Sequence, residues 1–93
     1  MMYPFIQLND KTEIVHSEMR YDDSGNEYVK VLIEKPIYGG FKSAECCLPK
    51  YQWSKIEGFT EEEIQELEKF LESVAHLIMR FAREGGLDNA ANF

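Results

Sequence analysis

The side chains that could take part in metal or nucleophilic chemistry are few in this sequence. They are two adjacent cysteines, Cys46 and Cys47, and two histidines, His16 and His76. Zinc sites use spacings such as Cys-x-x-Cys, which let two sulfurs reach one tetrahedral ion. Neighbouring residues of a strand point to opposite faces, so this cysteine pair diverges and cannot bridge distant parts of the fold. We therefore expect reduced thiols, no metal site and no cofactor.

The two histidines do not predict catalysis. His16 is expected on the solvent side of a strand with Glu18 and Arg20, and His76 on the solvent side of a helix. Neither has a serine, cysteine or aspartate arrangement typical of a catalytic triad. The segment Asp22-Asp23-Ser24-Gly25-Asn26 lacks the alternating carboxylates and the closing glutamate of an EF-hand, so we interpret it as a hairpin turn. We expect no catalytic residue and a protein that is not an enzyme.

Acidic residues concentrate on one predicted helix: Glu61, Glu62, Glu63, Glu66, Glu68 and Glu72. The positive end of the helix dipole explains the acids of the first turn, but its reach fades before Glu68 and Glu72. A solvated helix face is the simpler interpretation. The alternative is a surface that imitates a row of phosphates and occupies the basic groove of a partner protein.

The composition predicts one folded domain. The chain has 93 residues, of which 44% are hydrophobic and 13% aromatic, which argues against intrinsic disorder. The net charge of −7 repels phosphate backbones, so we expect no direct binding of nucleic acid. The first residues lack the basic and apolar regions of a secretory signal, and no apolar run is long enough to cross a bilayer. We expect a cytoplasmic protein that makes no membrane contact.

The stretch from Thr60 to Glu84 is the element that must organise the fold. Its apolar residues recur every three or four positions, as on one side of an α-helix: Ile64, Leu67, Leu71, Val74, Ile78 and Phe81. Thr60 and Glu63 form a Thr-x-x-Glu capping box at its start. Gly85 and Gly86 supply a left-handed residue that can end it.

Four strands are expected before this helix, within residues 3–8, 12–21, 27–35 and 41–48. Val29, Val31 and Ile33 should face the core from the third strand, and Ala44, Cys46 and Leu48 from the fourth. Short turns make consecutive strands antiparallel. The sequence therefore predicts a single α+β domain over residues 1–93, a four-stranded antiparallel, meander-like sheet with one long C-terminal helix on one face.

Two segments are expected to be irregular. Residues 49–59 are predicted to be a connector, in which Tyr51, Trp53 and Ile56 lie against the core and Trp53 is largely buried. Residues 87–93 show no periodicity and are predicted to be a flexible tail.

A homodimer is expected from a mismatch of lengths. A helix of about 25 residues is roughly 37 Å long, whereas a four-stranded sheet is about 15–20 Å wide. The apolar stripe continues to the last turn, so a second copy would cover it. Candidate interaction residues are the acids and apolar groups of these surfaces: Glu62, Glu66, Glu68, Glu72, Trp53, Ile78 and Phe81.

Three functions follow from these expectations. The first is a small acidic, non-enzymatic domain that binds another protein of unknown identity. The second is an acidic inhibitor or regulator that occupies the basic nucleic-acid groove of a partner. The third is an enzyme whose carboxylate or thiol site, with Cys47, forms between subunits.

Overall fold

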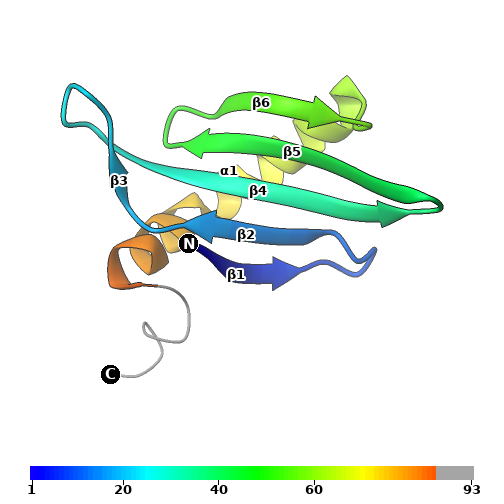
Figure 1. Ribbon diagram of the computed structural model, residues 1–93, viewed down its shortest axis with the longest axis horizontal. Coiled ribbons are helices and arrows are strands. Elements are labelled where there is room, and N and C mark those ends of the chain that lie inside the picture. Colours follow the sequence, from blue (N-terminus) through cyan, green and yellow to red (C-terminus); the bar gives the residue numbers. More distant parts are fainter. Residues whose placement is uncertain (86–93) are drawn as a thin grey trace.

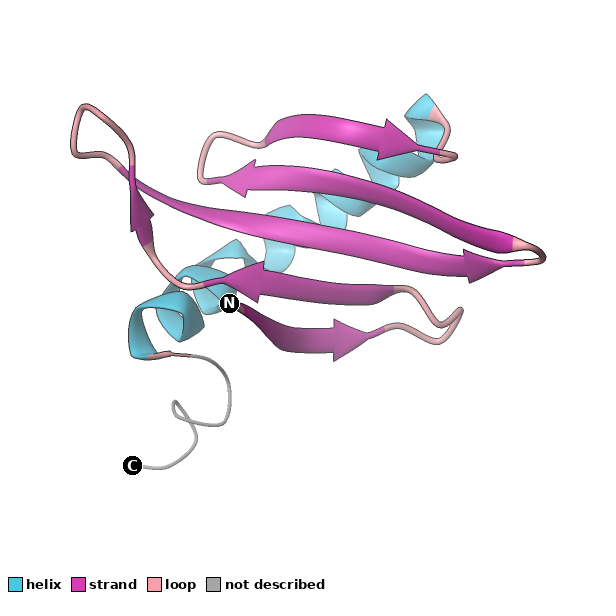
Figure 2. Ribbon diagram, viewed as in Figure 1, coloured by secondary structure: helices cyan, strands magenta, loops and turns pink. Residues whose placement is uncertain are grey.

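The computed structural model describes residues 1–85, which form one antiparallel sheet and one long helix (Figure 1). The chain order is β1 (Met2–Gln7), β2 (Glu13–Ser17), β3 (Arg20–Tyr21), β4 (Glu27–Ile37), β5 (Gly40–Leu48), β6 (Gln52–Glu57) and α1 (Glu61–Glu84). The sheet order is β1-β2-β4-β5-β6, and the two-residue β3 also pairs with β4. Figure 2 shows α1 crossing one face of the sheet. The predicted α+β architecture is confirmed, but the sheet has more than the expected four strands.

One row of paired residues crosses the five long strands. Tyr3 pairs with His16, His16 with Val31, Val31 with Cys46, and Cys46 with Trp53. The middle of this row lies in the core beneath α1. The predicted inward-facing residues of β4 and β5 are confirmed, because they make up most of a buried set: Ile14, Val29, Val31, Ile33, Ala44, Cys46, Leu48, Leu71, Ile78 and Ala82.

The predicted strand 12–21 is two short strands with an irregular step between them. The Ser17 hydroxyl accepts a hydrogen bond from the Lys30 backbone N–H at 3.0 Å and donates one to the Glu18 carbonyl at 2.8 Å. A side chain therefore takes the place of a backbone acceptor in the ladder. Because the strand stops there, Met19 and Tyr21 do not share the alternation of β2.

The expectation that His16 faces solvent is wrong. His16 is 0% exposed and lies on the same face of the sheet as Ile14. Its ring packs near Tyr3 and Phe5, with centroid distances of 5.7 and 6.5 Å. The expectation treated residues 12–21 as one strand, in which His16 shared a side with Glu18 and Arg20. The step after Ser17 breaks that alternation, so the residues after it do not indicate the side on which His16 lies.

The expected connector contains a strand, β6, which pairs with β5 through Cys46–Trp53 and Cys47–Gln52. Lys55 and Tyr51 have positive φ angles of 51° and 55°, and the register shifts along the pair. These irregularities remove the alternation that predicts a strand. Trp53 packs on the core but stays half-buried, and Ile56 is exposed instead of lying against the core.

The ends of α1 lie where the sequence predicts them. Thr60 is the N-cap, and its side chain accepts a hydrogen bond from the Glu63 N–H while the Glu63 side chain accepts one from the Thr60 N–H. Gly85 closes the helix with φ 84°. Gly86 and the predicted tail 87–93 lie outside the described residues. Within residues 1–85, no helix is both long and apolar enough to span a membrane.

The last turns of α1 are covered by the chain itself. Ile78 and Ala82 are buried, the Phe81 ring lies 6.0 Å from that of Phe5, and the Met19 N–H donates to the Ala82 carbonyl. The reason for expecting a second copy here no longer holds, because β1 and the step between β2 and β3 already cover these turns.

Candidate functional site

The predicted acidic residues of α1 divide into two groups. Glu61, Glu62, Glu66 and Glu72 are exposed and make no ion pair with any described residue. Glu68 accepts a hydrogen bond of 2.8 Å from Trp53 Nε1, and Glu63 pairs with Lys42 Nζ at 3.0 Å. The first group is therefore free to meet a partner, whereas the second holds β5 and β6 against the helix.

The predicted apolar interaction residues do not gather on one surface. Ile78 is fully buried against the sheet, and Phe81 is half-buried beside Phe5. Trp53 lies at the other edge of the sheet, on β6. Ile78 and Trp53 stabilise the packing of α1 on the sheet, and Trp53 also donates a hydrogen bond to Glu68 of the helix.

Hydrogen bonds lower the pKa of several carboxyls and keep them ionised. The backbone N–H of Asn26 lowers the pKa of Asp22, and the backbone N–H of Thr60 lowers that of Glu63. The pKa of Asp10 is lowered by its hydrogen bonds with Thr12. A catalytic acid requires the opposite shift, toward a protonated carboxyl at neutral pH. The lowered pKa values of these carboxyls follow from the hydrogen bonds that they accept in two turns and at the start of α1.

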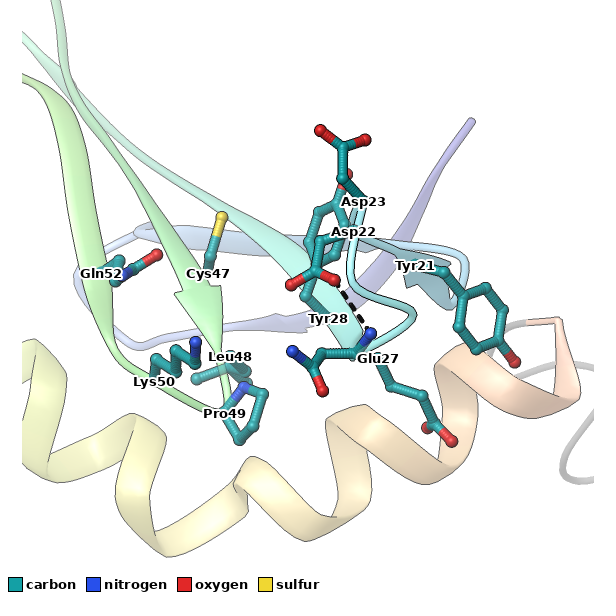
Figure 3. A pocket seen from close by; sticks show the side chains of 11 residues that line it. Tyr21, Asp22, Asp23, Glu27, Tyr28, Cys47, Leu48, Pro49, Lys50 and Gln52 are labelled. Carbon is teal, nitrogen blue, oxygen red and sulfur yellow. Dashed lines mark hydrogen bonds between the residues drawn. The ribbon is translucent and has the colours of Figure 1, made fainter.

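A hollow of about 610 Å³ lies between the β3–β4 turn and the β5–β6 turn, and we call it the turn hollow. Figure 3 shows Cys47 and Asp22 among the side chains at its wall. The Asp22 carboxylate accepts hydrogen bonds of 2.9 Å from the N–H groups of Ser24 and Asn26, so it serves its own turn. That turn is the one predicted from the sequence, with Gly25 at φ 82°.

The residues first considered for zinc do not come together. Cys46 is buried and Cys47 lies on the opposite face of β5. His16 and Cys46 flank Val31 on neighbouring strands, two strand spacings or about 10 Å apart. His76 is exposed on α1, as predicted. Burial raises the pKa of the Cys46 thiol to about 12, which keeps it protonated and a poor nucleophile.

The end of the β4–β5 hairpin is the main surface that the sequence analysis missed. Pairing between β2 and β4 ends at Glu34, and pairing between β5 and β6 ends at Ser43. The last three pairs of the hairpin, from Lys35–Lys42 to Ile37–Gly40, therefore extend beyond both neighbouring strands (Figure 1).

This overhanging end carries large apolar side chains in solvent. Tyr38 is 106% exposed, Phe41 66% and Ile37 44%. We call residues 36–41 the hairpin tip. The sequence did contain a signal, because Ile37, Tyr38 and Phe41 stand next to Gly39 and Gly40 at the end of the hairpin, where polar residues are usual.

A second hollow lies at the same end of the molecule, beside α1. It has a volume of about 290 Å³, and we call it the helix hollow. Its apolar lining comes from Leu8, Phe59, Leu67 and Phe70, all half-buried. Charged groups, among them Glu66 and Lys35, lie at its wall. Residues from the β1–β2 loop, the end of β4 and the first half of α1 thus meet around one apolar depression.

Comparison of this chain with protein-family models, with curated proteins and with solved structures found no match.

Proposed function

We propose that this protein is a small non-enzymatic protein-interaction domain and that the hairpin tip is its docking element. The observation that carries the proposal is the exposure of Ile37, Tyr38 and Phe41 on one segment beyond the sheet. Each such side chain gains about 1.5–3 kcal/mol when it is fully buried. Tyrosine is also enriched among the residues that dominate binding energy at protein interfaces.

The base of the hairpin supports this role because it holds the tip in place. Lys35 Nζ lies 3.3 Å from an Asp10 carboxylate oxygen, and Lys42 Nζ lies 3.0 Å from Glu63. Gly39, at φ 83°, allows the tight turn between the strands. A docking element that is already ordered loses less conformational entropy when it binds.

Photo-crosslinking in the native host tests the proposal. A photoreactive phenylalanine analogue is placed at position 38, and in a matched variant at position 21, because Tyr21 is 65% exposed at another part of the molecule. We expect a defined protein adduct from position 38 that disappears when Ile37 and Phe41 are changed to serine. The proposal fails if position 38 gives no protein adduct, or only the adducts that position 21 gives.

The second candidate is an acidic regulator that occupies a basic nucleic-acid groove, and the exposed, unpaired carboxylates of Glu62, Glu66 and Glu72 favour it. In that case nucleic acid should compete with this protein for the partner, and the affinity should fall as salt rises. Glu66→Lys with Glu72→Lys should weaken the complex, whereas serine substitutions at the hairpin tip should not. Binding of the partner that is insensitive to salt contradicts this candidate.

A further inference from the structure

We propose that His16 makes the edge strand β1 an acid-sensitive switch: when Nε2 of His16 takes up a proton, β1 leaves the sheet while the other strands and α1 remain folded together. We call the state in which β1 has left the sheet the open form, and the state shown in Figure 1 the docked form. β1 lies outside the hairpin tip, so this switch is independent of the proposed docking element.

The surroundings of His16 suit a neutral imidazole. The side chain is 0% exposed, and its Nδ1 donates a hydrogen bond of 2.8 Å to the Ser17 carbonyl. Within residues 1–85, Nε2 is buried and has no hydrogen-bond partner. Protonation turns this atom into a charged N–H donor. An unsatisfied charged donor costs more when it is buried than an unsatisfied neutral acceptor does.

β1 supplies the uncharged rings that cover this imidazole. The centroids of the Tyr3 and Phe5 rings lie 5.7 and 6.5 Å from that of His16. Tyr3 is also the residue that pairs with His16 across the two strands. An aromatic face attracts a cation, but it does not replace the hydrogen bonds by which water solvates both ring nitrogens. Release of β1 therefore gives the protonated ring access to water.

β1 is the strand whose release disturbs the fold least. It lies at an edge of the sheet, where β2 is the one strand that pairs with it. Pro4 has no N–H to donate, and the register shifts between Pro4 and Ile6, so Phe5 has no paired residue in β2. None of the six residues of β1 is fully buried. An interrupted ladder with little buried surface is typical of a segment that opens locally.

β2 keeps its place when β1 leaves. Four residue pairs join it to β4, and the Ser17 hydroxyl accepts a hydrogen bond of 3.0 Å from the Lys30 N–H. Ile14 of β2 belongs to the same buried cluster as the core residues of α1. In the open form β2 becomes the edge of the sheet. The open form also uncovers the Phe81 ring of α1, which lies 6.0 Å from that of Phe5 in the docked form.

No charged side chain compensates a proton on His16. Burial lowers the pKa of His16, and within residues 1–85 the Ser17 carbonyl is the one group that opposes this shift. β4 faces His16 with the apolar Val31, whereas Lys30 extends from the other face of β4 and pairs with Glu45. The titratable and charged groups along the second half of α1 are exposed to solvent: His76, Arg80, Arg83 and Glu84.

The ion pair at the start of β1 does not respond over the same pH range. The amino group of Met1 lies 3.4 Å from a carboxylate oxygen of Glu18, which also pairs with Arg20. A hydrogen bond with its own backbone lowers the pKa of Glu18 from 4.5, so this carboxylate stays ionised at pH 5 and above. A response of β1 to mild acid is therefore assigned to His16.

Proton linkage gives the size and the direction of the response. The open form exposes His16 to water, where its pKa has the ordinary value of 6.5, whereas the pKa in the docked form is lower. The docked form is therefore favoured above pH 6.5, and the open form gains as the pH falls below that value. Between pH 7.5 and pH 5.0 the ratio of open to docked form rises by at most about thirty-fold.

Amide hydrogen exchange at pH 7.5 and pH 5.0, with each rate divided by that of an unstructured peptide at the same pH, measures this ratio. We expect the opening of residues 2–7 to increase at pH 5.0 by about threefold to thirty-fold. His16→Asn should remove the increase, and the matched control His76→Asn, at an exposed histidine, should retain it. Opening of β1 that is independent of pH, or that increases equally in His16→Asn, overturns the proposal.

The same measurement shows whether the rest of the domain stays folded. Residues 29–33 of the central strand β4 should exchange more slowly than residues 2–7 at both pH values, because they open only when the core does. Equal opening of the two strands at pH 5.0 would mean that the domain unfolds as a whole, and it would overturn the proposal.

A disulfide between β1 and β2 tests the release of β1 with His16 intact. Pro4 and Val15 are paired on the face of the sheet opposite to His16, so Pro4→Cys with Val15→Cys, in a Cys47→Ser background, can join the strands. After oxidation, residues 2–7 should lose the increase at pH 5.0, and reduction of the same protein should restore it. Equal exchange in the oxidised and reduced proteins at pH 5.0 overturns the proposal.

Discussion

Among single residues, His16 is unusual because it is a titratable side chain that is fully buried. Its Nδ1 donates a hydrogen bond of 2.8 Å to the Ser17 carbonyl, which leaves Nε2 as a bare acceptor. Within residues 1–85, Nε2 is buried without a hydrogen-bond partner. The rings of Tyr3 and Phe5 flank the imidazole. A protonated ring would place a charge in this apolar environment, so burial lowers the pKa of His16.

The lowered pKa predicts that stability falls with mild acidification. Between the unfolded value of 6.5 and the lower folded value, the unfolded chain binds a proton that the folded chain does not. The contribution of neutral His16 is therefore fully present above 6.5 and is lost as the pH falls below it. We expect urea melts to show a lower free energy of unfolding at about pH 5 than at about pH 7.

Substitution of each histidine in turn shows which one causes the pH dependence of the free energy of unfolding. His16→Asn keeps a side-chain donor for the Ser17 carbonyl and does not titrate, so it should flatten the profile over this range. His76→Asn, at the exposed histidine, should leave the profile as steep as in the native protein. Asp10, Asp22 and Glu63 lose their contributions only at lower pH, because their pKa values are lowered from 3.8 or 4.5. Equal slopes for His16→Asn and the native protein contradict the prediction.

At the scale of elements, α1 shows how local chemistry sets a boundary. The capping box between Thr60 and Glu63 satisfies two backbone N–H groups that the first turn cannot satisfy itself. Glu63 also binds Lys42 of β5, so the same carboxylate fixes the start of the helix and ties it to the sheet. The first turn is therefore anchored in two directions.

Removal of the cap should destabilise the protein without changing its fold. We expect Thr60→Ala to lower the free energy of unfolding by about 1 kcal/mol. Thr60→Ser keeps the hydroxyl and should cost much less. Urea denaturation, followed by circular dichroism, measures both variants. An unchanged midpoint for Thr60→Ala would show that the hydroxyl does not stabilise the helix start.

At the scale of the whole molecule, one core joins the sheet to the helix. Leu71, Ile78 and Ala82 of α1 are buried in the same cluster as Val29, Val31 and other inward residues of the sheet. Neither element can bury its apolar side without the other. We therefore expect the sheet and the helix to unfold together in one transition.

Truncation of a core side chain tests this cooperativity. Leu71→Ala should lower the free energy of unfolding by about 2–5 kcal/mol, because it leaves a cavity beneath the centre of α1. Leu77→Ala, at a half-buried position on the flank of the helix, should cost less. Trp53 fluorescence reports the β6 edge and circular dichroism reports the helix. Two separate midpoints would contradict a single cooperative unit.

Features that depend on near neighbours along the chain could be predicted from the sequence. The helix start at Thr60, its stop at Gly85 and its buried stripe follow from capping chemistry and from a period of 3.6 residues. The inward faces of β4 and β5 follow from simple alternation, which is uninterrupted in those strands. The turn at residues 22–26 follows from Asp, Asn and Gly chemistry.

Features that depend on contacts between distant parts of the chain could be seen only in the fold. The phase of β2 depends on a hydrogen bond between Ser17 and Lys30, and β6 is recognisable only by its pairing with β5. The hairpin tip is exposed because β2 and β6 stop pairing before it ends, and the helix hollow needs residues from three separate segments. Side-chain type and spacing predict local conformation, but exposure and concavity are set by where other segments end, which no local pattern encodes.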